Sequence, residues 1–214
     1  MLYKEAAVEN FTNIPKFVRG GANRIELNDN LAVGGTTVSH GVLAQAAQYT
    51  QEHQISLVAM IRPRGGNFIY NDVELKMMES DLFTAQSFGV DGVTFGALRQ
   101  DGTLDTEAMD MLIGAAGGMD LIMHMAFDQI PEADQLAAID WLEEHQFSRI
   151  LTHGSPDLSQ PILDNTAHLK TLIDYTKTKD ITILPGGGIT ADNAETIAAA
   201  LGVNAVHGTK IIKL

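Results

Sequence analysis

The chain has 214 residues, of which 45% are hydrophobic and 19% are charged, and no Pro-, Gly- or Ser-rich linker divides it, so we expect one domain over residues 1–214. The formal net charge of −13 opposes nucleic-acid binding, which needs a basic surface. The absence of cysteine excludes disulfides, thiolate catalysis and Cys-based metal sites, and no apolar stretch approaches the roughly 18 residues of a membrane span. Because Met1 to Glu5 contains no basic segment followed by an apolar signal core, we expect a cytoplasmic protein without membrane or nucleic-acid partners.

Short apolar runs typical of β-strands alternate with amphipathic helical patterns along the chain. The predicted strands are Tyr3 to Val8, Arg24 to Asn28, Ser56 to Arg62, Asp91 to Phe95, Asp120 to His124, Arg149 to Thr152, Thr182 to Leu184 and Ala205 to His207. The predicted helices are Phe11 to Arg19, Val38 to His53, Val73 to Phe88, Thr106 to Ala116, Glu132 to His145, Asn165 to Thr178 and Ala191 to Leu201. Repeated β–α units indicate a parallel sheet, and eight strands predict a closed α/β barrel of the TIM type.

The end of the chain suggests that this barrel lacks its final helix. Such barrels run to about 250 residues, whereas this chain reaches Leu214 shortly after its eighth predicted strand. The outer face of the first and eighth strands would then need cover, either from the tail Lys210 to Leu214 or from a partner subunit, and a homodimer is the simplest cover. An open doubly wound sheet is the alternative architecture; it would lack pairing between the first and eighth strands.

Two arginines stand beside a Gly-Gly pair directly after the third predicted strand, in the segment Ile61 to Phe68. A guanidinium group offers five N–H donors in a planar fork that suits carboxylate or phosphate, and the glycines can adopt backbone angles closed to other residues. A cationic cluster is informative in so acidic a protein. We therefore predict that Arg62 and Arg64 bind a small anionic ligand, with two surface arginines in a turn as the alternative.

Polar residues also stand at the carboxyl ends of several other predicted strands, which converge on one mouth of such a barrel. Alternation along the second strand turns Glu26 and Asn28 toward the barrel axis, while Ile25 and Leu27 face the helices. The mouth is therefore expected to be polar.

The predicted acid–base residues at this mouth are Glu5, Glu26, His124, Asp128 and His207. Imidazole titrates nearest neutrality, so His124 or His207 can move a proton while Glu5 or Glu26 fixes the tautomer or shares the proton work. Histidines that merely make hydrogen bonds in the core are the alternative.

A triple glycine follows the seventh predicted strand and precedes the seventh helix, which exposes backbone N–H groups near a helix N-terminus. The loop after the eighth strand adds a hydroxyl and an ammonium group at Thr209 and Lys210. Loops at these two places often form a phosphate site in such barrels. We predict that Gly186, Gly187, Gly188 and Thr209 contact an anion, with a tight turn as the alternative.

The sequence contains no Ser-His-Asp motif, no His-Glu-x-x-His, no P-loop and no dinucleotide glycine fingerprint, so no nucleotide cofactor is implied. Met60, Met123 and Met125 carry soft thioether sulfurs, but methionine in a strand is far more often packing material. No metal ligand is predicted from the residues themselves.

Several segments together resemble the CutC family, known as copper homeostasis proteins. The specific ones are Ile61-Arg-Pro-Arg-Gly-Gly-Asn-Phe68 and His124-Met-Ala-Phe-Asp128. Weaker matches are Arg24-Ile-Glu-Leu27, Gly34-Gly-Thr36, Gly89-Val-Asp-Gly-Val93, Gly186-Gly-Gly-Ile189 and Val206-His-Gly208. The resemblance covers nearly the whole chain and implies an α/β barrel, a cytoplasmic setting, a dimer or higher assembly, and copper as the associated ion.

This chain departs from the family pattern at positions that bear on copper. Where the family commonly has cysteine, in the first strand and after Arg-x-Glu-Leu, this chain has Ala6-Ala7 and Asn28. Cu(I) favours thiolate and thioether ligands, so only methionine and histidine remain to hold it, which opposes direct Cu(I) binding. Family patterns also have Asp, Arg and Ser where this chain has Asn67, Met125 and His153.

Two hypotheses therefore stand side by side. The first is a copper homeostasis protein that binds or traffics copper, as the family name implies, although the chain largely lacks the soft ligands that direct Cu(I) binding needs. The second is a barrel enzyme of the lyase, isomerase or hydrolase kind, acting on a small anionic, phosphorylated or hydroxylated metabolite. The sequence leaves the question of enzymatic activity open.

Overall fold

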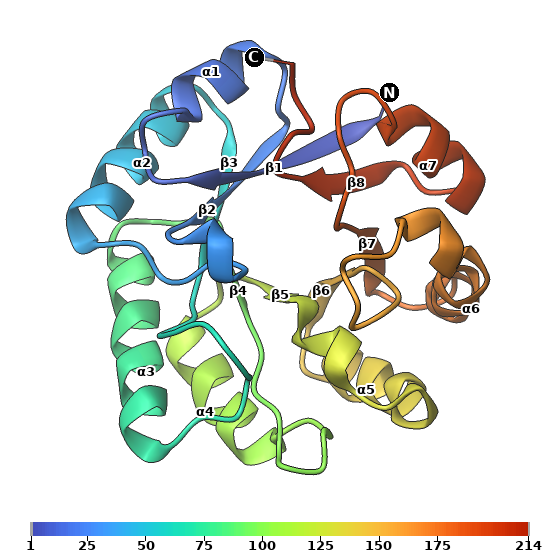
Figure 1. The fold of residues 1–214 in the computed structure, drawn as a ribbon. Helices are drawn as coiled ribbons and strands as arrows, with labels where there is room; N and C mark the ends of the chain where they lie inside the picture. The colour runs from blue at the N-terminus through green and yellow to red at the C-terminus, as the bar shows by residue number, and fades with distance from the viewer. Residues whose placement is uncertain (1, 214) are drawn as a thin grey trace.

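Eight parallel strands form the centre of the structure, a computed structural model that describes residues 2–213 (Figure 1). The strands are β1 Tyr3–Glu9, β2 Arg24–Asn28, β3 Ser56–Met60, β4 Gly92–Phe95, β5 Asp120–Met123, β6 Phe147–Thr152, β7 Thr182–Pro185 and β8 Ala205–Gly208. Hydrogen bonds join them in the order β7-β6-β5-β4-β3-β2-β1-β8. This ring is the predicted TIM-type barrel.

The pairing of β1 with β8 excludes the open doubly wound sheet. Glu5 on β1 lies opposite His207 on β8 in this parallel ladder. Within residues 2–213 no ladder joins β7 to β8; the loops that follow these two strands meet instead in a bridge between Thr190 and Lys210. The N–H of Ala191 donates to the carbonyl of Lys210 at 2.8 Å. A bridge between loops therefore completes the barrel at this seam.

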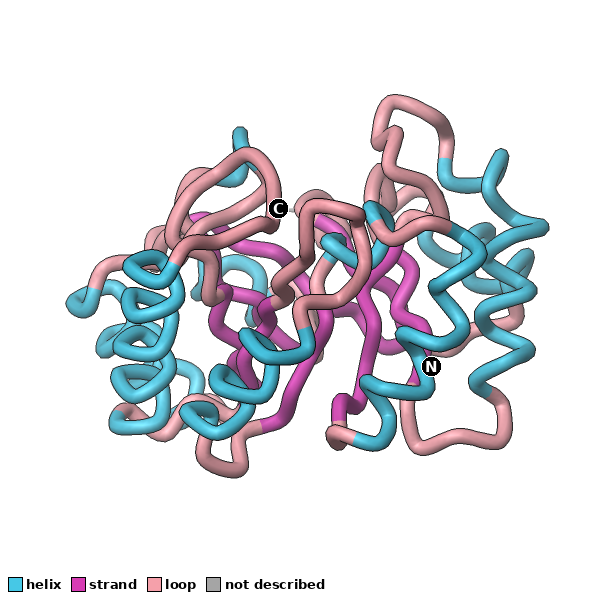
Figure 2. Tube along the Cα trace, turned by 90° about the horizontal axis from the view of Figure 1, so that it is seen from below, coloured by secondary structure: helices cyan, strands magenta, loops and turns pink. Residues whose placement is uncertain are grey.

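Helices surround the strands, and most of the longer loops lie at one end of the barrel (Figure 2). In residues 2–213 the α-helices are α1 Ile14–Arg19, α2 His40–Glu52, α3 Asp72–Ser87, α4 Thr106–Ala116, α5 Glu132–Glu144, α6 Thr166–Thr176 and α7 Ala194–Leu201. Each buries one apolar stripe against the strands, as Leu43 of α2 and Leu82 of α3 show. No helix in this part of the chain combines the length and the apolar character that crossing a bilayer demands.

The seventh helix begins three residues later than predicted, at Ala194 instead of Ala191. The side-chain oxygen of Asn193 accepts the N–H of Thr190 at 2.7 Å and holds the intervening residues in a turn. The triple glycine after β7 lies several residues before α7, and Nδ2 of Asn193, the residue that precedes this helix, donates to the carbonyl of Gly188 at 3.1 Å.

After β8 no helix follows up to residue 213, in agreement with the prediction that the final helix is absent. The tail instead packs against the barrel without forming a helix, and Ile211 and Ile212 are buried in the hydrophobic core. A Cβ added to Gly20, just beyond α1, would lie only 2.2 Å from Cγ2 of Ile212. The tail therefore supplies apolar cover beside α1; its final residue, Leu214, lies outside the described residues.

Candidate functional site at the barrel mouth

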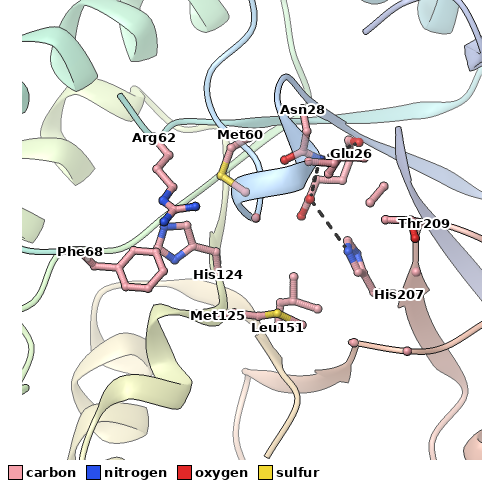
Figure 3. A pocket seen from close by; sticks show the side chains of 16 residues that line it. Glu26, Asn28, Met60, Arg62, Phe68, His124, Met125, Leu151, His207 and Thr209 are labelled. Carbon is pink, nitrogen blue, oxygen red and sulfur yellow. Dashed lines mark hydrogen bonds and ion pairs between the residues drawn. The ribbon is translucent and has the colours of Figure 1, made fainter. Parts of the chain in front are cut away.

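The carboxyl ends of the strands surround a cavity of about 170 Å³ (Figure 3). Its polar and sulfur-containing side chains are Glu26, Asn28, Met60, Arg62, His124, Met125, His207 and Thr209. Ile25 and Leu27 point the other way, into the apolar core, as the alternation along β2 predicts. The polar mouth expected from the sequence is therefore present, and it lies where the strand ends converge.

A chain of charged groups occupies the side of the cavity formed by β1, β2 and β8. Glu5 lies opposite Arg24 in one ladder and opposite His207 in the other, so the three side chains share a face. The Glu5 carboxylate accepts a hydrogen bond from Nε of Arg24 and lies 2.8 Å from Nδ1 of His207. Nε2 of His207 lies 4.0 Å from Oε1 of Glu26, which also accepts from Nδ2 of Asn28 at 2.9 Å. Oε2 of Glu26 is buried and has no partner among the described residues.

The three titratable groups of this chain shift in different directions. Burial would raise the pKa of Glu5, but the hydrogen bond and charge of His207, together with Arg24, lower it to about 2. Burial raises the pKa of Glu26, and the Glu5 carboxylate adds to this although His207 acts against it. Burial would lower the pKa of His207, but the two glutamates more than offset it and raise this pKa. Glu5 therefore remains ionised, and the buried His207 ring lies between its carboxylate and that of Glu26.

His124, directly after β5, occupies the opposite side of the cavity. The N–H of Ala126 donates to its Nδ1 at 3.2 Å, so in the neutral ring the proton resides on Nε2. That nitrogen is buried and finds no acceptor within residues 2–213. Burial, reinforced by the positive charge of Arg62, lowers the pKa of His124 to about 3. At neutral pH His124 is an uncharged hydrogen-bond donor.

Arg62 stands next to His124, and both side chains pack against the ring of Phe68. The ring centroids of Phe68 and His124 are 4.8 Å apart, and the guanidinium carbon of Arg62 lies 4.6 Å from the Phe68 centroid. Nη1 of Arg62 donates to the carbonyls of Val33 at 2.9 Å and Gly35 at 3.0 Å. Nη2 donates to the carbonyl of Gly66 at 2.7 Å. The arginine thus holds two loops together, and its buried Nε has no partner in the described chain.

The structure does not bring Arg64 to the cavity lining. Its guanidinium group pairs with Glu74 and donates to three backbone carbonyls of its own loop, and its side chain is 37% exposed. Arg64 therefore braces the loop after β3 against the start of α3.

Asp128 is likewise not part of the lining, although it is buried. It accepts hydrogen bonds from the Thr152 hydroxyl and from the N–H groups of His153 at 3.0 Å and Gly154 at 3.1 Å. Burial raises the pKa of Asp128 to about 6, although these donors act in the other direction. The contacts of this residue fix the loop after β6.

The triple glycine reaches the cavity in part. Gly187 and Gly188 line it together with Thr209, whereas Gly186 lies behind the lining and donates its N–H to the carbonyl of Thr152. Gly187 has φ +88°, and a Cβ there would lie 2.6 Å from Nδ1 of His153. This position therefore requires glycine for steric reasons, independently of any ligand.

Sequence reasoning missed two members of the site. Arg24 lies two residues before Glu26 on the same face of β2, so the alternation that identified Glu26 could also have found it. Phe68 ends the specific arginine segment, but nothing in its spacing shows that its ring supports both Arg62 and His124.

Comparisons with known proteins agree on one family. The family model described as the CutC family matches residues 2–212. A CutC family protein of Enterococcus faecalis is 52% identical over 211 residues, covering 99% of this chain and 100% of the relative. The copper homeostasis protein cutC homolog of Mus musculus is 38% identical over 203 residues, covering 95% of this chain and 71% of the relative.

A solved structure supports the same relationship. The crystal structure of CutC from Streptococcus agalactiae has a TM-score of 0.95 and 45% sequence identity, covering 99% of this chain and 100% of that one. The family resemblance inferred from the arginine segment and the His-Met-Ala-Phe-Asp segment is confirmed: the chain belongs to the CutC family.

Proposed function

We propose that this chain acts in copper homeostasis, the role stated in the name of its mouse relative, and that it does so without holding Cu(I) tightly at the barrel mouth. The observation that carries the copper role is the match to the family over residues 2–212. The donor set of the cavity supports the second half of the proposal.

The cavity offers Cu(I) no anionic sulfur ligand. The chain has no cysteine, and the sulfur atoms of the lining belong to the neutral thioethers of Met60 and Met125. Nε2 of His124 carries a proton because Nδ1 accepts the N–H of Ala126. His207 is held between two carboxylates that favour its protonated form. Two neutral thioethers supply soft atoms, but without a thiolate or an unprotonated imidazole nitrogen the set favours weak over tight binding of Cu(I).

An anaerobic competition titration tests this fit. The purified protein, the double variant Met60→Leu Met125→Leu and the control Met77→Leu, an exposed methionine of α3, compete for Cu(I) with a chromophoric chelator. We expect none of the three to withdraw Cu(I) at micromolar concentration. Stoichiometric binding by the wild type and by Met77→Leu, with a binding free energy beyond about −8 kcal/mol and lost in the double variant, would contradict the proposal.

Cells that lack their own copy of the protein test the copper role itself. Growth in raised copper and total cellular copper are measured with the wild-type gene, with Glu26→Gln and with an empty vector. We expect the wild type to restore both quantities. Equal growth and equal copper content with the wild type and the empty vector would contradict a role in copper homeostasis.

We also propose a cytoplasmic location and a homodimer, both supported by the family resemblance. Cell fractionation checks the location. Sedimentation equilibrium checks the assembly, where a mass equal to a single chain over the accessible concentration range would contradict the dimer.

A further inference from the structure

We propose that the barrel mouth is an acid–base site for a small 2-oxo carboxylate, in which Glu26 takes a proton from the carbon beside the ketone while His124 donates a hydrogen bond to the ketone oxygen. The proposal rests on the geometry of the cavity and does not depend on the copper role.

Four buried polar atoms of residues that line this cavity have no partner among residues 2–213. They are Oε2 of Glu26, Oδ1 of Asn28, Nε2 of His124 and Nε of Arg62. Three of them belong to the ionisable residues Glu26, His124 and Arg62, which are 2%, 3% and 4% exposed. An orphaned buried polar group costs about 1–3 kcal/mol, so such a set is expected where a ligand completes the hydrogen bonds.

The arrangement of these atoms indicates the chemistry of the ligand. Arg62 and His124 lie together against Phe68, while Glu26 and His207 lie across the cavity from them (Figure 3). Two neighbouring donors suit two neighbouring oxygen acceptors, as a carboxylate and an adjacent ketone present them. The cavity of about 170 Å³ is below the range of about 300–1,000 Å³ typical of drug-sized ligands, which favours a small metabolite.

The charges around the cavity favour a single anion. With Glu26 ionised and His207 protonated, Arg24, Arg62 and His207 are positive. Glu5 and Glu26 are negative, which leaves one net positive charge. His124 is neutral because burial and Arg62 hold its pKa near 3. A monocarboxylate therefore balances the site in a protein whose formal net charge is −13.

The proposed step is a reversible enolisation. The C–H bond beside the ketone breaks, the proton passes to Oε2 of Glu26, and the electron pair moves onto the ketone oxygen to give an enolate. The N–H on Nε2 of His124 stabilises the oxyanion, as preorganised donors do in such sites. Return of a proton to the same carbon restores the ketone, so the step needs no further reactant.

His207 and Glu5 act as positioning residues behind Glu26. Nε2 of His207 lies 4.0 Å from Oε1 of Glu26, so it acts on the carboxyl group through its charge, and Glu5 holds the opposite ring nitrogen at 2.8 Å. In heavy water the proton that Glu26 carries exchanges for deuterium from the solvent between turnovers, and the substrate carbon acquires the label.

The rate should rise with pH through the ionisation of Glu26. Burial and the charge of Glu5 raise its pKa, whereas His207, the hydrogen bond from Asn28 and the charge of Arg24 act in the other direction. The exchange rate should therefore rise at a pH above the ordinary pKa range of a glutamate, because the net shift of the Glu26 pKa is upward.

The test follows loss of the methyl proton signal of pyruvate by NMR in heavy water, with purified protein and no added copper. The variants are Glu26→Gln, His124→Asn and the exposed control Glu107→Gln on α4. Asn can accept the N–H of Ala126 as a capping residue while removing the Nε2 donor, so His124→Asn is expected to keep the local fold. Urea unfolding of each variant verifies folding.

We expect wild type and Glu107→Gln to accelerate exchange above the buffer rate. Glu26→Gln should lose about 100- to 10,000-fold and His124→Asn about 100- to 1,000-fold. Dihydroxyacetone phosphate serves as a second probe, because its phosphate is remote from its ketone. Exchange with dihydroxyacetone phosphate but not with pyruvate would overturn the assignment of a 2-oxo carboxylate. The acid–base site itself would be overturned if neither probe exchanged above the buffer rate, or if folded Glu26→Gln kept full activity.

Discussion

His207 and His124 are both buried at the same barrel mouth, yet the two sides of the cavity give them opposite properties. The carboxylates of Glu5 and Glu26 raise the pKa of His207, whereas burial and Arg62 lower that of His124 to about 3. Parallel strand register puts Glu5 opposite His207, and the N–H of Ala126 fixes the tautomer of His124. The role of a buried histidine is therefore set by its neighbours: one side of the cavity can carry a proton, while the other can only donate a hydrogen bond.

The largest expected effect comes from removing the charge that organises the His207 side. Glu5→Gln leaves Arg24 and His207 buried without their carboxylate partner. Breaking a buried pair in this way typically costs about 3–5 kcal/mol, and we expect that loss in the free energy of unfolding measured with urea near pH 7. Glu79→Gln, which removes the exposed pair with Lys76, should change it by less than about 1 kcal/mol. Equal losses in the two variants would mean that the buried network has no special role.

The same network predicts how the free energy of unfolding falls at acid pH. The pKa of Glu5 is depressed from 4.5 to about 2 in the folded chain, so its contribution is present above pH 4.5 and is lost as the pH falls toward 2. Glu5→Gln should lack this part of the pH dependence. If the free energy of unfolding depended on pH in the same way in the wild type and in Glu5→Gln between these pH values, the depressed pKa of Glu5 would be contradicted.

An intermediate effect is expected on the His124 side. Arg62→Met removes the donors to the carbonyls of Val33, Gly35 and Gly66, which should lower the free energy of unfolding by about 1–3 kcal/mol. It should also raise the pKa of His124, because the neighbouring positive charge is gone. The exposed control Arg99→Met should change stability by less than about 0.5 kcal/mol. An unchanged pKa of His124 in an NMR titration of Arg62→Met would show that the charge of Arg62 does not lower it.

The smallest expected effect concerns His207 alone. Glu26→Gln removes the carboxylate charge that raises its pKa most, so the His207 titration should move to lower pH while the His124 resonances stay in place. Ring-nitrogen NMR follows both histidines in one sample. A shift of both resonances, or of neither, would show that the two sides are not electrostatically distinct.

The sequence predicted the positions that depend on strand periodicity and strand ends. Glu26 and Arg62 reach the cavity because alternation along β2 and the end of β3 determine where their side chains point. Arg64 and Asp128 do not line it, because each belongs to a turn whose hydrogen bonds redirect it. Arg64 extends toward Glu74 at the start of α3, and the 3₁₀ turn Met125–Gln129 carries Asp128 to the loop after β6. Such turns depend on contacts between segments that are distant in the chain.

The sequence alone could not separate the roles of the two histidines either. Both follow apolar strand residues in similar local sequences. Their difference comes from the partner of one ring nitrogen, a backbone N–H for His124 and the Glu5 carboxylate for His207. Glu5 is 202 positions away from His207 in the chain, and closure of the barrel brings them together.

The manner of that closure has a mechanical consequence. Seven ladders join neighbouring strands, but across residues 2–213 the β7–β8 seam is linked through the Thr190–Lys210 bridge of its loops. A tensile load applied across the seam, through handles at the exposed residues Thr182 and Asn204, would fall on far fewer hydrogen bonds than a load across any other strand pair. In a single-molecule pulling measurement we expect the ring to part at this seam first, at a lower force than the ladders withstand.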